Sequence, residues 1–366
     1  MTDSPILLTP GPLTTAPETR RAMLRDWGSR DPAFIALTAE MRSRLLRVAG
    51  AEGTHVAVPL QGSGTFIVEA AIATLLAPGD KLLVLINGAY GERMVTIARR
   101  MGRAVEALRW PEDQPVDSAR VAESLRADPA ITHVALVHCE TTTGILNPLP
   151  EVATVVAEAG RAFLLDAMSS FGALDLNLSA VPVTAVLASS NKCLEGVPGL
   201  GFALITPAAL ERAKGNSPSL SFDLHAQWRG FESDGQWRFT PPVQVVAALV
   251  EALRRLEAEG GPAARGRRYQ RNFDTLLAGM RRLGFELFLD EAVQAPIIAT
   301  FRMPSDRPLE FRAFYDALAD RGFLIYPGKL TQAETFRIGC IGALDRPDFE
   351  RLLEAVAATL RSPVTA

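Results

Sequence analysis

The sequence predicts an α/β protein with a large domain built on a mainly parallel seven-stranded sheet and a smaller C-terminal α+β domain. Short apolar segments alternate with helical segments from about residue 56 to residue 205, a pattern typical of a parallel sheet with helices on both faces. Polar or glycine-rich loops follow the apolar segments. The sequence Gly260-Gly261-Pro262 then interrupts a long helical pattern, and helices and strands occur in mixed order after it.

These observations divide the chain into three parts. Residues 1–15 are expected to form an extended arm, because proline recurs in residues 5–12 and removes the backbone donors that a helix needs. Residues 16–259 are expected to form the large domain. Residues 260–366 are expected to form the small domain, with the glycine pair as the hinge.

The elements follow from hydrophobic period and from helix breakers. Strands of the large domain are expected at 56–60, 81–86, 105–110, 131–138, 162–166, 183–188 and 202–205. Its helices are expected at 17–25, 32–48, 66–76, 92–101, 117–127, 149–159, 207–214 and 243–258, with a loop between the last two. The small domain is expected to hold helices at 263–283, 308–321 and 345–361 and strands at 285–288, 297–301, 324–326 and 336–338.

Composition limits the classes of function. The 366 residues are 48% hydrophobic and 22% charged with a net charge of −3, which gives no reason to expect nucleic acid or an anionic membrane as a partner. No apolar run is long enough to span a bilayer. Three widely spaced cysteines indicate reduced thiols in a cytoplasmic protein. Four scattered histidines give no spacing for a metal site, so no metal is expected.

One lysine stands out among the four in the chain. Lys192 follows the apolar segment 183–188 and precedes a glycine-rich turn, so we expect it just beyond the end of a buried strand. Ligands bind at that edge of open α/β sheets. A buried lysine readily loses its proton, and its neutral amine can form a Schiff base. A plain surface lysine after a strand is the alternative.

Gln61-Gly-Ser-Gly-Thr65 lies between a predicted strand and a predicted helix. Small residues at a helix start leave backbone N–H groups free for an anion, and two hydroxyls add donors. The segment lacks both the dinucleotide-binding glycine spacing and the lysine of a P-loop. It is therefore expected to hold a phosphate group, although a simple helix cap gives the same pattern.

Two further strand ends carry residues suited to a ligand. Tyr90 lies among small residues after segment 81–86 and is able to stack on an aromatic ring. Asp166 ends segment 162–166, where a buried carboxylate needs a partner. A cationic ring nitrogen of a ligand would be a suitable partner for this carboxylate, and an arginine that pairs with it in a purely structural role is the alternative.

Together these residues suit pyridoxal 5'-phosphate. That cofactor needs a lysine for its aldehyde, an anion cup, a stacking ring and an acid that keeps its ring nitrogen protonated. Lys192, residues 62–65, Tyr90 and Asp166 would supply all four. Their agreement is much stronger evidence than any one of them.

The chain resembles the class V, fold-type I aminotransferases over essentially its whole length. The sequences that carry the resemblance lie at residues 8–14, 26–27, 61–65, 87–93, 138–144, 166–172, 190–199, 326–329 and 334–339. The resemblance implies that Lys192 binds the cofactor and moves the proton, and that Asp166 pairs with the ring nitrogen. It also implies that the remaining cofactor contacts come from Ser63, Gly64, Thr65, Tyr90, Thr141 or Thr142, Asn191 and Thr240. Thr240 would reach the phosphate of a second subunit, which implies a homodimer with shared sites.

Within this family the chain is similar to the enzymes that transfer an amino group from 2-aminoethylphosphonate to pyruvate. The resemblance implies a role in phosphonate catabolism, with phosphonoacetaldehyde and L-alanine as products. It also implies that Arg337 binds the acidic group of both substrates and that Arg30 assists. A planar guanidinium suits phosphonate and carboxylate alike. The alternatives are an alanine– or serine–glyoxylate aminotransferase and a non-catalytic binding protein of the same fold.

Overall fold

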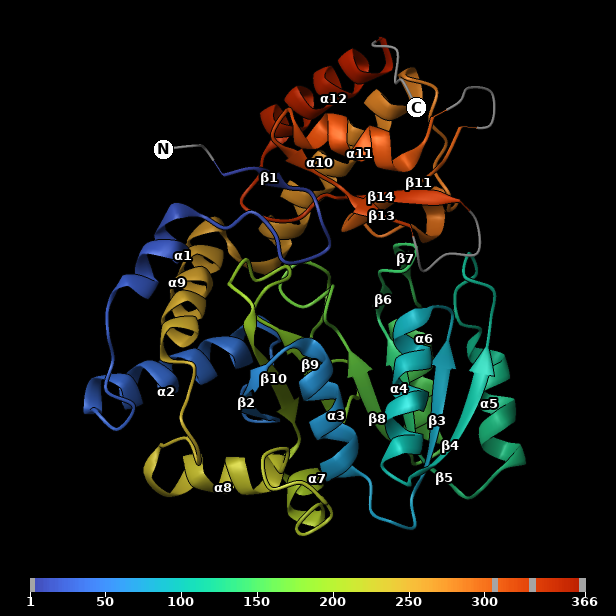
Figure 1. Cartoon of the computed structure of the whole chain (residues 1–366). Helices are drawn as coiled ribbons and strands as arrows, with labels where there is room; N and C mark the ends of the chain where they lie inside the picture. The colour runs from blue at the N-terminus through green and yellow to red at the C-terminus, as the bar shows by residue number, and fades with distance from the viewer. Residues whose placement is uncertain (1–3, 305–308, 329–333, 362–366) are drawn as a thin grey trace.

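The computed structural model describes residues 4–304, 309–328 and 334–361 (Figure 1). A seven-stranded sheet forms its largest layer, with strand order β2-β10-β9-β8-β5-β3-β4. The strands are β2 (Val56–Gly62), β3 (Lys81–Ile86), β4 (Ala104–Arg109), β5 (Ile131–Val137), β8 (Ala162–Asp166), β9 (Ala185–Ser189) and β10 (Gly199–Ile205). Strand β10 runs antiparallel to the other six strands of this sheet, which are parallel to one another. The predicted fold class is confirmed.

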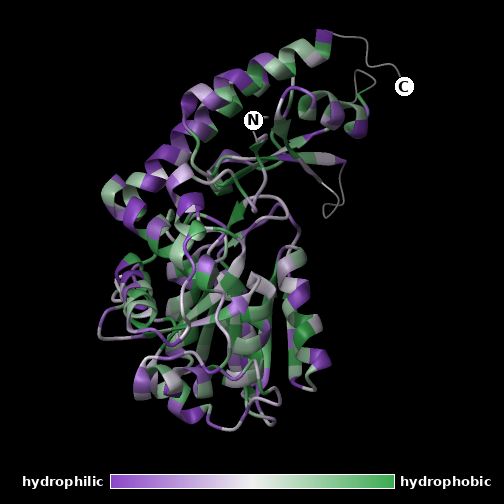
Figure 2. Ribbon diagram, turned by 60° about the vertical axis from the view of Figure 1, so that its left-hand side comes forward, coloured by the Kyte–Doolittle hydropathy of each residue, from purple (hydrophilic) through white to green (hydrophobic). Residues whose placement is uncertain are grey.

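Helices cover both faces of this sheet. Leu83 and Leu85 pack on one face with α2 (Pro32–Val48), α5 (Ser118–Ala127), α6 (Leu149–Glu158) and α9 (Val243–Glu259). Leu82, Val84 and Ile86 pack on the other face with α3 (Gly64–Leu75), α4 (Ala89–Arg100), α7 (Pro207–Arg212) and α8 (Leu224–Asp234). Because successive side chains of a strand point to opposite faces, a strand buried on both faces needs a continuous apolar run. Figure 2 shows these hydrophobic strands enclosed by helices with hydrophilic outer residues.

Residues after α9 form a smaller unit above the sheet in Figure 1. A three-stranded antiparallel sheet has the order β11 (Ile298–Arg302), β14 (Thr335–Gly339) and β13 (Tyr326–Pro327). It packs with α10 (Gly261–Arg282), α11 (Phe311–Ala319) and α12 (Arg346–Arg361) around a phenylalanine-rich core. The short elements of the chain are α1 (Pro17–Arg21), η1 (Ala22–Leu24), β6 (Cys139–Glu140), β7 (Ile145–Leu146) and η2 (Glu291–Val293).

The N-terminal arm is tied to this smaller unit. Strand β1 (Ile6–Leu7) pairs in parallel with β12 (Phe323–Leu324). The division into residues 1–15, 16–259 and 260–366 stays a prediction. The predicted helix break is present, because α9 ends at Glu259 and α10 begins at Gly261.

Two predicted elements were wrong. The segment between α7 and α9 contains helix α8 where a loop was expected. The segment is polar and aromatic, so it shows no clear helical pattern. The helix is nevertheless capped at both ends. Asp223 accepts a hydrogen bond from the Ala226 N–H at its start, and Gly235 adopts the left-handed conformation at its end. The strand expected at 285–288 is reduced to an isolated bridge between Leu287 and Phe301. Of the helix expected at 308–321, residue 308 lies outside the described residues.

Within the part of the chain that the structure describes, no helix combines the length and the apolar character needed to cross a membrane.

Candidate active site

A cavity of about 170 Å³ lies at the carboxyl ends of β2, β3, β5, β8 and β9. This is the sheet edge at which ligands bind in α/β proteins. The structure brings eight of the predicted site residues together as its lining: Ser63, Gly64, Thr65, Tyr90, Thr141, Asp166, Asn191 and Lys192. The other four, Thr142, Arg337, Arg30 and Thr240, do not line it.

Lys192 lies on the turn that follows β9. The N–H of Glu195 donates to the carbonyl of Lys192 over 2.8 Å, and the N–H of Gly196 donates to the carbonyl of Ser190 over the same distance. Burial lowers the pKa of Lys192, because the cavity wall disfavours the charged amine. The turn therefore presents an amine that becomes a neutral nucleophile more easily than a solvated lysine does.

Asp166 is the last residue of β8 and is buried in the cavity wall. Its Oδ1 accepts a hydrogen bond from the N–H of Met168 over 2.9 Å. Burial raises the pKa of Asp166 to about 7. A cationic partner in the cavity would restore its negative charge, since an opposite charge favours the ionised carboxylate.

The predicted anion cup lies where β2 meets α3. Ser63 is the N-cap of α3 but makes no capping bond with its side chain, so its hydroxyl is available to a ligand. A Cβ placed on Gly64 would come within 2.7 Å of the sulfur of Met168. A side chain at Gly64 would therefore have to displace Met168. Gly64 and Thr65 line the cavity at the start of α3, beside the positive end of the helix dipole, where backbone N–H groups can bind an anion.

Arg93 adds a cation to this cup, and sequence reasoning missed it. Its Nη1 donates to the Thr65 hydroxyl over 3.1 Å, and its guanidinium lies 4.7 Å from the centre of the Tyr90 ring. The signal was present, since Tyr90 and Arg93 lie three residues apart on α4 and such residues share a helix face. The arginine also fixes the tyrosine ring at the cavity wall.

Glu140 is a second residue that sequence reasoning missed. It is fully buried, and its carboxylate accepts hydrogen bonds from the Tyr90 N–H over 3.1 Å and the Thr142 hydroxyl over 2.6 Å. The Thr142 hydroxyl also accepts from the N–H of Ala89 over 3.0 Å. Thr142 therefore joins two loops behind the cavity wall, whereas Thr141 lines the cavity itself.

The N-terminal arm lies directly against the lysine. A Cβ placed on Gly11 would come within 2.8 Å of the carbonyl oxygen of Asn191 and 2.9 Å of Cδ of Lys192. Gly11 also has a φ of 123°, a conformation that other residues rarely adopt. The arm thus closes one side of the site.

Arg337 lies on β14 and is 1% exposed. Its Nη1 donates to the carbonyl of Thr141 over 2.7 Å, and its Nε and Nη2 donate to the carbonyl of Pro327. Burial lowers the pKa of Arg337. Among the described residues no carboxylate forms an ion pair with it, Glu334 included. Arg337 is thus joined to the cavity wall without lining the cavity.

Arg30 and Thr240 lie together, away from the cavity that contains Lys192. Both line a second cavity of about 280 Å³, which shares no residue with the cavity at Lys192. Lys329, which belongs to one of the sequences behind the family resemblance, is outside the described residues.

The residues at the first cavity fit pyridoxal 5'-phosphate. The cup at Ser63–Thr65 with Arg93 would hold its phosphate, and Lys192 would hold its aldehyde carbon. Asp166 would hold a proton on the ring nitrogen, because that cation removes the cost of ionising a buried carboxyl. Tyr90 offers a flat ring at the cavity wall.

Comparisons with known proteins agree with this fit. The family model described as "Aminotransferase class-V" matches residues 22–329. A 2-aminoethylphosphonate–pyruvate transaminase from Burkholderia lata is 56% identical, with 98% of this chain and 95% of the relative covered. One from Pseudomonas aeruginosa is 54% identical, with 98% and 96% covered.

Solved structures are similar over the same extent. The alanine–glyoxylate aminotransferase from Nostoc sp. is 28% identical with a TM-score of 0.92, covering 99% of this chain and 96% of that one. The pyridoxamine–pyruvate aminotransferase from Mesorhizobium loti is 26% identical with a TM-score of 0.89, covering 98% and 94%. The chain therefore belongs to the class-V aminotransferases, and its cofactor is pyridoxal 5'-phosphate.

Proposed function

We propose that this aminotransferase transfers the amino group of 2-aminoethylphosphonate to pyruvate and yields phosphonoacetaldehyde and L-alanine. One observation carries the proposal: relatives named for this reaction are 52% to 56% identical over about 98% of the chain. The alanine–glyoxylate aminotransferase structure shares 28% identity, so the glyoxylate alternative is the weaker fit.

The three free cysteines are all buried, and the cytoplasm is the compartment that we propose.

Lys192 and Asp166 are proposed as the residues that perform the chemistry. When bound, pyridoxal phosphate supplies an aldehyde that takes up the amino group and a ring that draws electrons from the neighbouring carbon. Nζ of Lys192 accepts the proton of the carbon that bears the amino group and later returns a proton. Its lowered pKa suits an amine that must act as a base near neutral pH. The Asp166 carboxylate holds the proton on the ring nitrogen.

Arg337 is proposed to bind the acidic group of both substrates. A guanidinium carries five N–H donors, and the three hydrogen bonds to Thr141 and Pro327 leave one hydrogen on each terminal nitrogen. Two such hydrogens can bind a phosphonate or a carboxylate side by side. The phosphonate donor and the keto acid bind in turn, so one arginine can serve both.

We propose a homodimer in which Thr240 and Arg30 reach the partner's site. The two residues line one cavity away from Lys192 of their own chain, which is the arrangement that a shared site requires. Exposed Phe239 beside Thr240 and exposed Phe66 beside the anion cup offer apolar surface for the contact. Mixing inactive Lys192→Ala chains with inactive Thr240→Arg chains tests this, because a mixed dimer holds one intact site. No recovery of activity would count against shared sites.

A single half-reaction tests the substrate. The purified enzyme, loaded with pyridoxal phosphate, is mixed with 2-aminoethylphosphonate and no keto acid, and the visible absorbance is followed. The expected result is rapid conversion of the cofactor to its amine form by the phosphonate, with little conversion by serine. L-alanine, the product of the second half-reaction, also converts the cofactor by the reverse of that step, so it serves as a positive control. Conversion by serine or alanine but not by the phosphonate would overturn the substrate assignment and leave the family unchanged.

A further inference from the structure

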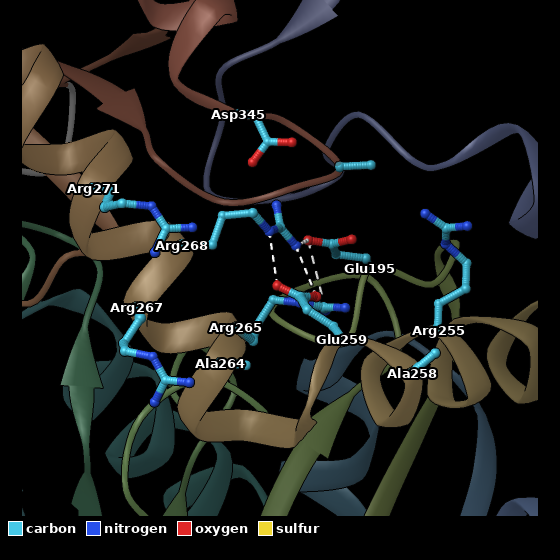
Figure 3. A pocket seen from close by; sticks show the side chains of 11 residues that line it. Glu195, Arg255, Ala258, Glu259, Ala264, Arg265, Arg267, Arg268, Arg271 and Asp345 are labelled. Atoms are coloured by element: carbon cyan, nitrogen blue, oxygen red, sulfur yellow. Dashed lines mark hydrogen bonds and ion pairs between the residues drawn. The ribbon is translucent and has the colours of Figure 1, made fainter.

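A third, larger cavity of about 600 Å³ lies where α9, α10 and the turn after Lys192 meet (Figure 3). Two arginines and two glutamates on its wall form a connected set of ion pairs: Arg265, Arg268, Glu195 and Glu259. Two other arginines on the same wall, Arg267 and Arg271, make no ion pair with a described residue. The four paired residues are therefore a specific arrangement within an arginine-rich surface.

Glu195 is the residue in this set that belongs to the lysine turn. Among the described residues it is the one non-glycine residue with a positive φ, 60°. Glycine adopts that conformation without strain, yet the chain places a carboxylate there, 4% exposed. A strained residue persists where its surroundings hold it in place, and such residues gather at functional sites.

Side chains of α10 hold Glu195 and the turn. The Glu195 carboxylate accepts hydrogen bonds from Nη2 of Arg268 and from the hydroxyl of Tyr269, each over 2.7 Å. Arg265 donates to the carbonyl of Cys193 over 2.8 Å. The turn that begins at Lys192 is thus bonded to one helix at both Cys193 and Glu195.

The same arginine reaches the segment that follows β14. Nη1 of Arg268 donates to the carbonyls of Gly342 over 2.7 Å and Leu344 over 2.9 Å. Its Nε donates to Glu259, the last residue of α9, over 2.9 Å. Arg268 therefore joins the lysine turn, the α9–α10 junction and the segment that follows the strand that carries Arg337.

We propose that Glu195, Tyr269 and Arg268 are positioning residues for Lys192. They hold the turn so that Nζ stays at the distance and direction needed to bond the cofactor's aldehyde carbon. A small displacement of such a group has a large effect, because covalent bond formation needs closely defined geometry. The inference rests on the proposed role of Lys192 as the covalent anchor.

The test compares two forms of the cofactor. Pyridoxal phosphate bonds to Lys192, whereas pyridoxamine phosphate has no aldehyde and occupies the same cavity without that bond. For Glu195→Gln and Tyr269→Phe, the dissociation constant of pyridoxal phosphate measured on the cofactor-free enzyme is expected to rise on the order of tenfold. The dissociation constant of pyridoxamine phosphate is expected to stay within about twofold of the wild-type value. Arg268→Gln is expected to behave as Glu195→Gln does.

Matched controls lie on the same helix. Arg267→Gln and Arg271→Gln remove a charge from the same wall without touching the turn, and both dissociation constants are expected to stay unchanged. If Arg268→Gln does not fold, Glu195→Gln and Tyr269→Phe carry the test. Equal weakening of both cofactor forms, or no weakening of either, overturns the proposal. Neither measurement involves an amino donor, so failure here leaves the substrate proposal standing.

Discussion

Arg337 donates a hydrogen bond from Nη1 to the carbonyl oxygen of Thr141 over 2.7 Å. This bond joins β14 of the smaller unit to the wall of the cavity that contains Lys192. A guanidinium held in this way changes position little when an anion binds, so little entropy is lost on binding. The bond therefore places the proposed anion site and the lysine in a fixed relation.

Replacement of Arg337 by alanine should weaken the binding of both substrates. We expect the KM for the phosphonate donor and the KM for pyruvate each to rise on the order of tenfold to a hundredfold, because each acidic group loses its charged hydrogen bonds. Steady-state kinetics with each substrate varied in turn measures both. Arg302→Ala, an exposed arginine on the neighbouring strand β11, is the control. A rise confined to one substrate contradicts a single shared site.

Replacement of Lys192 by alanine should abolish turnover without unfolding the chain, because the side chain ends in a cavity. Borohydride reduction of the loaded enzyme, followed by mass spectrometry, should attach the cofactor to wild type and to the surface control Lys214→Ala. It should not attach the cofactor to Lys192→Ala. Measurable steady-state turnover by Lys192→Ala would falsify the assignment of this lysine.

Much of the site could be predicted because parallel strands end at one edge of a sheet. In the large domain the seven predicted apolar runs correspond to the strands of the sheet, and the residues where the parallel runs end lie at one edge. Lys192 and Tyr90 follow two different strands and Asp166 ends a third, and the structure places all three on one cavity. No long-range contact had to be known to bring them together.

The parts that could not be predicted depend on contacts between distant segments. Glu140 is buried against the N–H of Tyr90, and nothing in its own sequence neighbourhood marks that contact. Gly11 lies against Lys192, although the sequence between these two residues contains most strands of the large sheet. Arg30 and Thr240 are also far apart in the sequence, and they share a cavity only because the fold brings their segments together. Local pattern predicts elements, whereas these contacts appear only once the elements are packed.

Replacement of Gly11 by alanine should weaken the site as well as the fold. The new Cβ would lie 2.8 Å from the Asn191 carbonyl and 2.9 Å from Cδ of Lys192, so the arm or the lysine must move. Gly53→Ala is the control, because Gly53 also has a positive φ but a Cβ there would meet nothing within 4 Å. Both variants should lose roughly 1 kcal/mol of stability from backbone strain. Only Gly11→Ala should also bind pyridoxal phosphate more weakly, and equal binding by the two would contradict the proposed contact.

Replacement of Asp166 by asparagine should stabilise the cofactor-free enzyme much more at pH 8 than at pH 5. Burial raises the pKa of Asp166 from 3.8 to about 7, so the folded state binds this proton more tightly than the unfolded state does. The resulting stability is fully present below pH 3.8 and is lost as the pH rises to about 7. At about 1.4 kcal/mol per pH unit, the loss approaches roughly 4 kcal/mol. An asparagine at this position stays neutral, so the variant does not lose this stability as the pH rises.

The melting temperatures of the two cofactor-free proteins at pH 5 and pH 8 measure this effect. Glu140 and Lys192 are present in both proteins, so the difference reports the Asp166 carboxyl together with its interaction with these two groups. Asp175→Asn, which changes an exposed carboxylate, should show no comparable dependence on pH. With pyridoxal phosphate bound, the order at pH 8 should reverse, since the ring nitrogen gives the Asp166 carboxylate the cation that it lacks. A difference that is equal at both pH values would mean that burial does not control this carboxyl.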